Sequence, residues 1–517
     1  MNTSGKLLLI AFSLSVFACK QGKKAEVNDA SAGIGAIENA ILAQDTSFYY
    51  IDTKNYFANE KVEDLAIGVF DSGTGGLTVL DALVQYDKNN NTNAQVGEDG
   101  NPDFNKENFI YLADQANMPY GNYFKANKTD LLKEHIIKDT QFLLGQKYYA
   151  NSADNNFQTN KQKIKAIVIA CNTATAYGQE DVDAFMAKTG LNIPVIGVIN
   201  AGSRGTLQKI AKDESGAIGV FATVGTVASN GYGKTLLKMA KEQGYTGDIQ
   251  IFNQGGHGVA EAVDGEPDFI NRKLAQPRED YRGPSLTNND FKIDKTLMDV
   301  YNFNFDHGKM LCDGKSGDDC NVLQINDTEN YVRYHLVSLM EQIRKSEKPQ
   351  PLKALVLGCT HYPYLVKEIN KVLTELYNYK GKDGKYIYRN LMIAKVNIIN
   401  PAEYVAKELY DALKKNNHFN NNGDMRSKSE FYISVPNLAN SNVKADAEGR
   451  FTYDYKYGRN AGEIQQYVKV VPFNKTNISV ETLDRFKSAI PTTFEMIKNF
   501  NGTNKKLEET PNNDRIN

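Results

Sequence analysis

The chain has 517 residues, of which 41% are hydrophobic, 24% charged and 10% aromatic. This composition is typical of a globular protein and excludes a mainly disordered, collagen-like or coiled-coil chain. The 60 basic and 62 acidic residues give a formal net charge of -2. No basic block is long enough to follow a phosphate backbone, so no nucleic-acid partner is expected. The length predicts roughly two to four domains, fewer if loop insertions account for part of it.

The N-terminus is typical of an exported lipoprotein. Lys6 precedes an apolar run over residues 7–17, which is too short to span a bilayer. The run ends at Val16-Phe17-Ala18-Cys19, which resembles a bacterial lipobox. We therefore expect residues 1–18 to be a lipoprotein signal peptide and Cys19 to be acylated; the alternative is an ordinary signal peptide with a chance cysteine. Residues 19–64 are expected to form a tether and an N-terminal extension. The predicted location is the bacterial cell envelope, lipid-anchored on the periplasmic side or at the cell surface.

Two later cysteines flank a short polar loop. Cys312 and Cys320 enclose residues 313–319, and an oxidising compartment favours a disulfide between them. In the chain-entropy model, closing a loop of this length stabilises the fold by about 2.6 kcal/mol. The acidic residues of the loop are an alternative signal for calcium, but they lack the alternating carboxylates and the closing Glu of an EF-hand.

Short apolar runs repeatedly stop at a polar or small residue and are followed by a helical pattern, which predicts an α/β fold with parallel strands. Three of these junctions carry reactive or polar side chains. They are residues 65–70 followed by Asp71-Ser72-Gly73, residues 166–170 followed by Cys171-Asn172-Thr173, and residues 354–358 followed by Cys359-Thr360-His361. Because ligands bind at the carboxyl ends of parallel strands, the two cysteines are candidates for one site built from two halves.

The position of the two thiols predicts their chemistry. A thiol beside a helix N-terminus has its pKa lowered by the helix dipole, which favours the thiolate that can abstract a proton. The alternative is that Cys171 and Cys359 are buried structural cysteines, since free cysteine is among the most buried residue types. The polar neighbours Asn172, Thr360 and His361 favour the functional interpretation.

Six motifs in this order resemble those of the glutamate racemase family, within the aspartate/glutamate racemase superfamily. They are Ile67-Gly68-Val69-Phe70-Asp71-Ser72-Gly73, Met118-Pro119-Tyr120-Gly121, Ala170-Cys171-Asn172-Thr173-Ala174, Ile193-Pro194-Val195-Ile196-Gly197-Val198-Ile199, the segment from Ile218-Gly219-Val220 to Thr226, and Leu357-Gly358-Cys359-Thr360-His361-Tyr362-Pro363. The resemblance implies two doubly wound parallel-sheet lobes, Rossmann-like or flavodoxin-like, with an active-site cleft between them. It covers roughly residues 65–406, with interruptions.

The resemblance also implies a cofactor-independent, metal-free racemase that interconverts L- and D-glutamate with two bases. Inversion at Cα needs a base on one face and an acid on the other, and Cys171 and Cys359 would supply them. By analogy with the family, Asp71 would assist Cys171 and His361 would assist Cys359. The substrate's ammonium and carboxylates would be held by the polar groups of these motifs: Asp71, Ser72, Tyr120, Gly121, Asn172, Thr173, Thr360 and His361. The alternative roles are helix capping for Asp71 and Ser72, and a structural hydrogen bond for His361.

This chain departs from the family in several places. Where the family has a Cys-Pro pair leading to a glutamate, residues 255–264 read Gly-Gly-His-Gly-Val-Ala-Glu-Ala-Val-Asp, so either Glu261 or Asp264 would replace that glutamate. Polar insertions fall near residues 87–107, 146–163 and 265–345, and a long C-terminal region follows residue 402. We expect a first lobe over 65–198 plus 398–501, which includes the C-terminal extension, a second lobe over 199–397, and a frayed tail over 502–517. Sequence does not decide whether these additions cover the cleft, bind a partner or decorate the surface.

The predicted export signal conflicts with the resemblance, because members of the glutamate racemase family that make D-glutamate for cell-wall precursors work in the cytoplasm. Three hypotheses follow: an exported glutamate racemase-like enzyme, a racemase of another amino acid, and a catalytically inactive racemase fold that binds ligands as a lipoprotein. The expected partners are a small amino acid, glutamate first, a lipid bilayer reached through Cys19, and a second copy of the chain in a homodimer.

Overall fold

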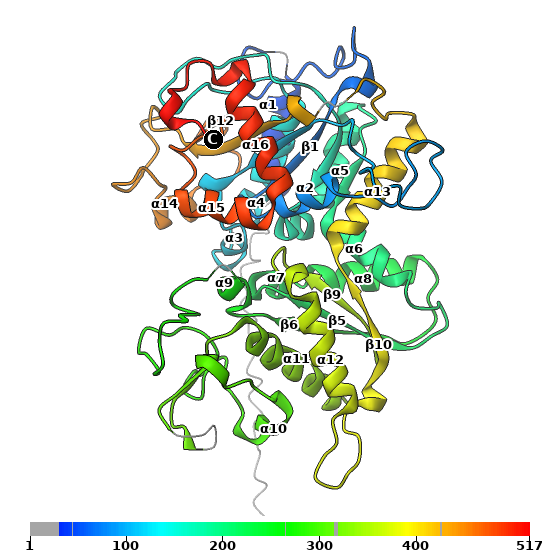
Figure 1. The fold of residues 1–517 in the computed structure, drawn as a ribbon. Coiled ribbons are helices and arrows are strands. Elements are labelled where there is room, and N and C mark those ends of the chain that lie inside the picture. Colours follow the sequence, from blue (N-terminus) through cyan, green and yellow to red (C-terminus); the bar gives the residue numbers. More distant parts are fainter. Residues whose placement is uncertain (1–29, 44, 264, 315–318, 424–425) are drawn as a thin grey trace, which may run out of the picture.

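The computed structural model describes residues 30–43, 45–263, 265–314, 319–423 and 426–517. The predicted signal peptide 1–18 and the predicted lipidation site Cys19 lie outside these residues. The described chain forms two α/β lobes stacked one on the other (Figure 1). This arrangement confirms the predicted fold class.

The first lobe is built on a six-stranded sheet with the order β12-β11-β2-β1-β3-β4. Its strands are β1 (Ala66–Asp71), β2 (Phe109–Ala113), β3 (Ile164–Ile169), β4 (Val195–Gly197), β11 (Glu430–Pro436) and β12 (Val468–Pro472). Neighbouring strands are parallel except β11 and β12. The central strands β1, β2 and β3 are buried along their whole length, as expected where helices cover both faces of a parallel sheet.

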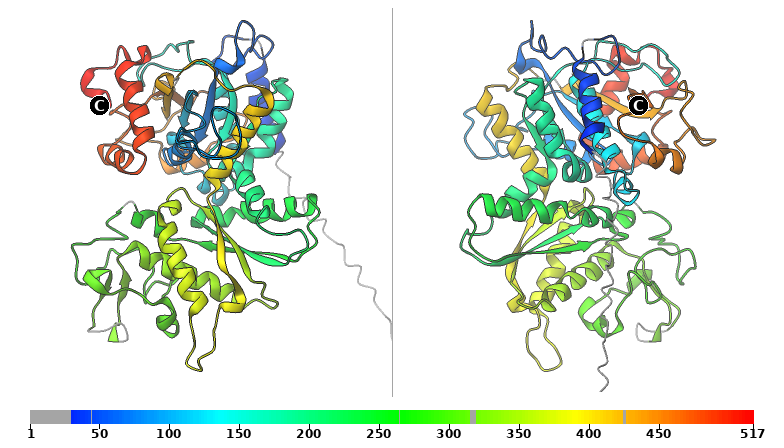
Figure 2. Two further views of the ribbon diagram at one scale, coloured as in Figure 1. Left: turned by 45° about the vertical axis from the view of Figure 1, so that its right-hand side comes forward. Right: turned by 180° about the vertical axis from the view of Figure 1, so that it is seen from behind.

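Two groups of helices enclose this sheet (Figures 1 and 2). On one face, α4 (Thr129–Leu144) and α5 (Asn172–Thr189) pack together, and α1 (Ala30–Leu42) packs on α4. On the other face lie α2 (Leu77–Val84), α13 (Pro401–Asn416) and α16 (Pro491–Thr503). The short helices α3 (Gly121–Lys125), α14 (Tyr453–Gly458) and α15 (Val480–Ala489) lie at the end of the lobe that faces the second lobe (Figure 1).

The second lobe has a four-stranded parallel sheet with the order β10-β9-β5-β6. Its strands are β5 (Gly216–Ala222), β6 (Ile249–Gly255), β9 (Leu352–Gly358) and β10 (Met392–Ile399). The helices are α6 (Val198–Leu207) and α8 (Gly231–Glu242) on one side, α11 (Thr328–Arg344) and α12 (Val366–Asn378) on the other, and the short α7 (Val224–Ser229) and α9 (Val259–Val263) after β5 and β6. Short 3-10 helices throughout the described chain are η1 (Val62–Asp64), η2 (Gln115–Asn117), η3 (Lys295–Leu297), η4 (Asp306–Gly308), η6 (Tyr362–Leu365), η7 (Arg389–Leu391), η8 (Arg426–Lys428), η9 (Lys505–Leu507) and η10 (Asn512–Asp514).

The chain passes between the lobes through α6 and α13, which pack closely on each other. Arg204 of α6 forms an ion pair with Glu408 of α13. Gly205 lies against Tyr404, and a Cβ added at Gly205 would come within 2.2 Å of that ring. The glycine is therefore needed for the close approach of the two connecting helices.

Not all of the predicted insertion 265–345 is an addition to the second lobe. Residues Thr328–Arg344 form α11, which packs against β6 and α12 and is a layer of the lobe itself. The part before α11 carries α10 (Met298–Tyr301) and a small antiparallel sheet of β7 (Met310–Cys312) and β8 (Leu323–Ile325). A disulfide joins Cys312 to Cys320 at a Cα–Cα distance of 5.6 Å, within the normal range for a bridge.

The C-terminal region extends the first lobe. β11 pairs with β2 in parallel and β12 closes the edge of the sheet. The prediction of a frayed tail over 502–517 is wrong, because Leu507 and Ile516 are buried in the core of the first lobe. Arg515 fixes the turn by donating to the backbone oxygens of Thr510 and Leu507. The segment is mostly polar, but its two apolar residues Leu507 and Ile516 pack it against the first lobe.

Candidate active site

The loop after β1 presents Asp71 and Ser72 at the carboxyl end of the first sheet. Asp71 Oδ2 accepts a hydrogen bond from the Gly76 backbone N–H at 2.8 Å. The hydroxyl of Tyr111, in the middle of the neighbouring strand β2, donates to the backbone oxygen of Gly73 at 2.7 Å and so holds the loop in place. Burial raises the pKa of the Asp71 carboxyl, which makes it a stronger base than an exposed carboxylate.

Cys171 follows β3 and caps the N-terminus of α5. Its Sγ accepts a hydrogen bond from the Ala174 N–H at 3.4 Å, and the thiol donates to Ser72 Oγ at 3.6 Å. Asp71 is also a side-chain hydrogen-bond partner of this thiol. The structure therefore brings together Asp71, Ser72 and Cys171, as the sequence predicts for the first half-site.

The predicted direction of the Cys171 pKa is wrong. Burial, followed by the negative charge of Asp71, raises the pKa of the Cys171 thiol to about 12. The helix N-terminus does contribute the Ala174 hydrogen bond, which lowers the pKa. This effect is smaller than the cost of placing a thiolate in a buried site next to a carboxylate. Cys171 is therefore a neutral thiol at neutral pH in this structure.

Cys359 follows β9 at the carboxyl end of the second sheet. His361 Nδ1 lies 3.7 Å from Cys359 Sγ and 3.5 Å from Thr360 Oγ1. The next residue, Tyr362, is fully buried, and its hydroxyl donates to the backbone oxygen of Gly256 at 3.1 Å. The second half-site thus places the imidazole next to its cysteine, as predicted.

The two half-sites meet across the lobes. Tyr232, from α8 of the second lobe, donates to Asn172 Oδ1 of the first lobe at 3.0 Å. The same phenol lies within electrostatic range of Cys359, which contributes to its raised pKa after burial. Cys171 and Cys359 are both free thiols and only 6% exposed.

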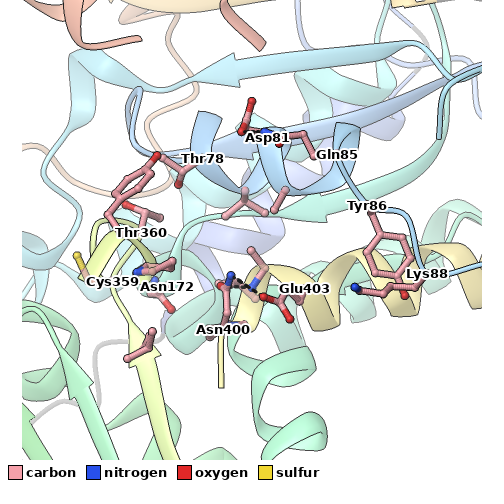
Figure 3. A pocket seen from close by; sticks show the side chains of 18 of the residues that line it. Thr78, Asp81, Gln85, Tyr86, Lys88, Asn172, Cys359, Thr360, Asn400 and Glu403 are labelled. Carbon is pink, nitrogen blue, oxygen red and sulfur yellow. Dashed lines mark hydrogen bonds between the residues drawn. The ribbon is translucent and has the colours of Figure 1, made fainter. Parts of the chain in front are cut away.

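A cavity of about 490 Å³ joins residues of both half-sites. Asn172 of the first lobe and Cys359 and Thr360 of the second lie side by side at one end of it, and Tyr86 and Lys88 lie at the other (Figure 3). Asn400 and Glu403, at the start of α13, line its middle. The cavity therefore runs from Cys359 toward the side on which α6 and α13 connect the lobes.

The hydroxyl of Tyr120, a predicted substrate-binding residue, is directed toward two buried carboxyls of its own lobe. That hydroxyl lies 2.6 Å from both Asp114 Oδ2 and Asp139 Oδ2, and the side chain is 1% exposed. Burial and the neighbouring charge of Asp114 raise the pKa of the Asp139 carboxyl well above its usual range. Tyr120 is thus part of the support beneath its loop.

Gly121 and Thr173 occupy the remaining predicted positions. Gly121 begins α3, and a Cβ added there would lie 4.0 Å from the Gly225 Cα of α7 in the second lobe. Thr173 is partly exposed in the first turn of α5, next to Asn172. Gly121 therefore lies at the boundary between the lobes, and Thr173 lies at the carboxyl end of the first sheet. A substrate can reach both places.

Of the two candidates for the missing glutamate, Asp264 lies outside the described residues. Glu261 lies on α9 and is half-buried. Its charge, together with that of Cys359, contributes to the raised pKa of Tyr362, although burial is the main cause. In place of the Cys-Pro pair, Gly256 packs against Tyr362, where a Cβ would come within 2.1 Å of the phenol oxygen. The altered segment therefore makes room for this tyrosine.

Sequence reasoning missed three tyrosines that shape the site: Tyr111, Tyr232 and Tyr364. Tyr111 lies in strand β2, and Tyr364 directly follows the motif that ends at Pro363. The spacing of these residues in the sequence does not indicate which backbone group each hydroxyl contacts. Tyr232 sits in an ordinary helical run and reaches Asn172 only because the lobes fold together. Tertiary contact alone reveals these roles.

Within the part of the chain that the structure describes, one cluster has metal-ligand residue types: Cys312, Asp313 and Cys320. Its two sulfurs are joined in the disulfide, so they are not available as thiolate ligands. None of the described helices is both long enough and apolar enough to cross a membrane.

Comparisons with known proteins agree with the motifs. No protein-family model matches the chain. It is 33% identical over 188 residues, 36% of this chain and 50% of the relative, to a glutamate racemase of Oceanobacillus iheyensis. It is 25% identical over 350 residues, 68% of this chain and 82% of the relative, to a glutamate racemase of Lysinibacillus sphaericus. The chain spans about half the length of the first curated relatives it matches.

Among solved structures, a glutamate racemase isoform from Bacillus anthracis is 23% identical, with 71% of this chain and 87% of that chain covered and a TM-score of 0.40. The similarity to glutamate racemases therefore rests on the sequence comparisons. These sequence similarities confirm the predicted resemblance to glutamate racemases.

Proposed function

We propose that this protein is an amino-acid racemase that interconverts L- and D-glutamate by proton transfer at Cα between two thiols, without a cofactor. One observation carries the proposal. Two free, buried cysteines stand at the carboxyl ends of parallel strands in different lobes, Cys171 after β3 and Cys359 after β9, each beside its own acid–base partner. A purely structural role for the two cysteines would not require each of them to lie at a strand end beside an acid–base group.

The reaction needs one base and one acid on opposite faces of Cα. In one direction, one cysteine acts as thiolate, takes the Cα proton and becomes a thiol. The other cysteine gives its thiol proton to the carbanion from the opposite face and becomes a thiolate. One proton leaves the substrate and one returns, so the configuration inverts. The reverse reaction exchanges the two roles.

Asp71 is proposed to generate the Cys171 thiolate. A thiol with a pKa of about 12 does not lose its proton at neutral pH without help. Asp71 is in hydrogen-bond contact with it, and burial raises the carboxyl pKa, so proton transfer from sulfur to Asp71 is less unfavourable than to an ordinary carboxylate. The ammonium group of a bound amino acid would stabilise the resulting thiolate. His361 would serve Cys359 in the same way from 3.7 Å.

The substrate's polar groups are proposed to contact Ser72, Asn172, Thr173, Thr360 and the backbone at Gly121. Asn172 Oδ1 is occupied by the Tyr232 hydroxyl. The amide is thereby oriented, and its Nδ2–H groups are donors for a carboxylate. Tyr232 is a positioning residue in this scheme, because it acts through Asn172.

The proposal is tested by incubating the purified protein with L-glutamate in deuterated water. If the protein is a racemase, the optical rotation and the Cα proton signal should be lost at the same rate. The reason is that the incoming hydrogen comes from a thiol that exchanges with solvent, so deuterium replaces the Cα proton at each inversion. Heat-inactivated protein is the control. Bound glutamate without exchange or loss of rotation would contradict the proposal and favour a ligand-binding lipoprotein.

A second candidate is a racemase of another amino acid. The observation that favours it is the replaced segment 255–264, in which Gly256 and Tyr362 pack where the family has a Cys-Pro pair. Assaying other L-amino acids in the same way distinguishes the two, since glutamate and an alternative would be converted at different rates.

The proposed location is the cell envelope, with the protein anchored through acylated Cys19. Expression of a Cys19→Ala variant in a lipoprotein-competent bacterium is expected to move the protein from the membrane to the soluble fraction. Unchanged membrane retention would exclude the lipobox interpretation. A homodimer stays a prediction that analytical ultracentrifugation of the purified protein would check.

A further inference from the structure

A second cavity, of about 690 Å³, lies on the other side of the site from the connecting helices. Its walls come from three parts of the chain. The segments after β1 and β2 contribute Thr74, Gly75, Thr78, Gln115 and Met118; the second lobe contributes Val263, His361 and Tyr364; the C-terminal extension contributes Ile433 of β11 and residues between Asn477 and Ile490. We call this cavity the vestibule.

The vestibule adjoins the proposed reaction site directly. His361, the partner of Cys359, forms part of its wall, and Thr74 and Gly75 belong to the loop that carries Asp71 and Ser72. Thr78 and Tyr364 line both the vestibule and the 490 Å³ cavity. A ligand in the vestibule is therefore next to the groups that would act on an amino acid.

The C-terminal extension forms a complete wall of the vestibule. Helix α15 and its flanks contribute Ile478, Thr482, Phe486 and Ile490 among others. The hydroxyl of Tyr364 in the second lobe donates to the backbone oxygen of Ala489 at 3.1 Å, which joins this wall to the segment after Cys359. The extension thus encloses space beside the site that the two racemase-like lobes alone would leave open.

The lining indicates what the vestibule accepts. Buried apolar side chains of Ile433, Ile478, Phe486 and Ile490 form part of it. Hydroxyl and amide side chains supply hydrogen-bond donors and acceptors: Thr74, Thr78, Gln115, Asn477, Ser479, Thr482 and Ser488. The wall also includes the cationic side chain of Arg485. The mixture as a whole matches an amide-linked chain that carries a carboxylate, in which polar peptide groups alternate with aliphatic carbon.

Size points the same way. Pockets of roughly 300–1,000 Å³ bury ligands of drug size, and the vestibule's 690 Å³ comes in addition to the 490 Å³ cavity that contains Cys359. One free glutamate molecule, with about ten non-hydrogen atoms by its formula, is much smaller than a ligand of that class. The space beside His361 is therefore available for a substituent on the reacting amino acid.

We propose that the vestibule binds an amide-linked extension of the reacting residue, so that the substrate class is a short glutamate-containing peptide of two or three residues. This inference rests on the proposed racemase function and specifies its substrate. The reacting Cα lies between the thiols, and the attached residue occupies the space between α2, η6 and α15. The proton transfers at Cα are unchanged, because the amide bond is neither formed nor broken.

Two measurements test the inference. The first compares L-glutamate with dipeptides that carry alanine on its α-amino group, its α-carboxyl group or its side-chain carboxyl group, following Cα exchange in deuterated water. The second is calorimetric titration of the same compounds, which reports binding without turnover. We expect at least one dipeptide to bind and exchange with a kcat/KM about tenfold or more above that of free glutamate. The attachment point of that dipeptide identifies which substituent faces the vestibule.

Variants of α15 show whether the vestibule causes the preference. Thr482→Trp fills the cavity, whereas Lys487→Trp places the same side chain on the exposed face of the same helix. The ratio of dipeptide to glutamate kcat/KM is expected to fall about tenfold in Thr482→Trp and to stay unchanged in Lys487→Trp. Equal ratios in the two variants would overturn the inference.

The outcomes separate this inference from the proposed function. Racemisation of free glutamate with neither binding nor exchange of any dipeptide would overturn the vestibule as a substrate site and leave the racemase intact. Dipeptide binding that Thr482→Trp weakens, without exchange of any compound, would support the vestibule as a binding site and contradict the racemase.

Discussion

The Tyr364 hydroxyl donates a hydrogen bond to the backbone oxygen of Ala489, 3.1 Å away. Tyr364 stands five residues after Cys359, and Ala489 ends α15 of the C-terminal extension. One bond therefore links the segment that carries the second thiol to a part of the chain that the family resemblance does not cover. Helix α15 lies on the opposite side of the molecule from α6 and α13 (Figure 1).

Removing this bond should loosen the cleft on that side. We expect Tyr364→Phe to lower the stability of the closed arrangement of the lobes by about 0.5–1.5 kcal/mol, the usual net contribution of one hydrogen bond. The change in KM should be larger than the change in kcat. Steady-state racemisation kinetics measure the split. Tyr386→Phe, an exposed tyrosine on the hairpin between α12 and β10, is the matched control. Identical kinetics for both variants would exclude a role for the bond.

Each thiol should be essential in both directions. Cys171→Ser and Cys359→Ser are each expected to lower racemisation of L- and D-glutamate by about a thousandfold or more, because a hydroxyl is a much weaker acid than a thiol: it donates a proton less readily and hardly forms the anion that would act as the base. Each single variant should still eliminate a leaving group from one enantiomer of a β-substituted analogue, because elimination needs only the abstracting base. The two variants should prefer opposite enantiomers. Full racemase activity in either one would exclude the two-base mechanism.

The pH dependence of Cys171 follows from its raised pKa. The folded thiol has a pKa of about 12 against an ordinary value of 9.0. The stabilisation from keeping it protonated is therefore fully present below about pH 9 and is lost as the pH rises toward 12. Alkylation of Cys171 by iodoacetamide should accordingly increase steeply at high pH.

Asp71→Asn removes the second cause of that shift. The Cys171 pKa should fall, so alkylation at pH 8 should become faster, by about tenfold for each unit by which the pKa falls. Mass spectrometry that resolves the two cysteine peptides measures the rates, and Cys359 in the same sample is the internal control. A slower reaction of Cys171 in Asp71→Asn would show that the carboxylate promotes the thiolate already in the free protein.

The docked C-terminus should contribute to stability. Leu507 is fully buried in the first lobe, so Leu507→Ala is expected to lower the free energy of unfolding by about 2–5 kcal/mol. Asn513→Ala, on the exposed turn before Ile516, should change it by no more than about 0.5 kcal/mol. Urea denaturation followed by tyrosine fluorescence compares the two. Equal stability would mean that the tail does not pack in solution.

The disulfide should matter for stability and not for chemistry. Cys312→Ser is expected to destabilise the second lobe by about 2.6 kcal/mol in the chain-entropy model for a loop of this length. The bridge lies in the insertion at the end of the lobe away from the cleft (Figure 1), so kcat and KM should stay the same. Thermal unfolding and racemisation assays on one preparation check both statements.

The sequence predicted what depends on local pattern. Buried strand runs ending at Asp71, Cys171 and Cys359 are local signals, and parallel pairing necessarily places their carboxyl ends at one edge of each sheet. The pairings Asp71 with Cys171 and Cys359 with His361 followed from the motifs, and the structure has both.

What the sequence did not predict depends on tertiary contacts. The direction of the Cys171 pKa is decided by desolvation, which no neighbouring residue in the chain reveals. The Tyr120 hydroxyl is hydrogen-bonded to Asp114 and Asp139, 6 and 19 residues away. β11 joins β2 over more than three hundred residues, so the role of the C-terminal extension appears only in the folded chain.

The contact of α6 with α13 has a mechanical consequence. Gly205 against Tyr404 and the pair of Arg204 with Glu408 hold the two connecting helices together at one edge of the molecule. A small rotation about that edge displaces nearby groups little and distant groups most, as at the free end of a lever. Asn400 and Glu403 would barely move, whereas Tyr364 and Ala489, at the far edge, would separate first. Admission of a ligand and separation of the thiols would then be one motion, with the largest travel at the entrance and the smallest at the pivot.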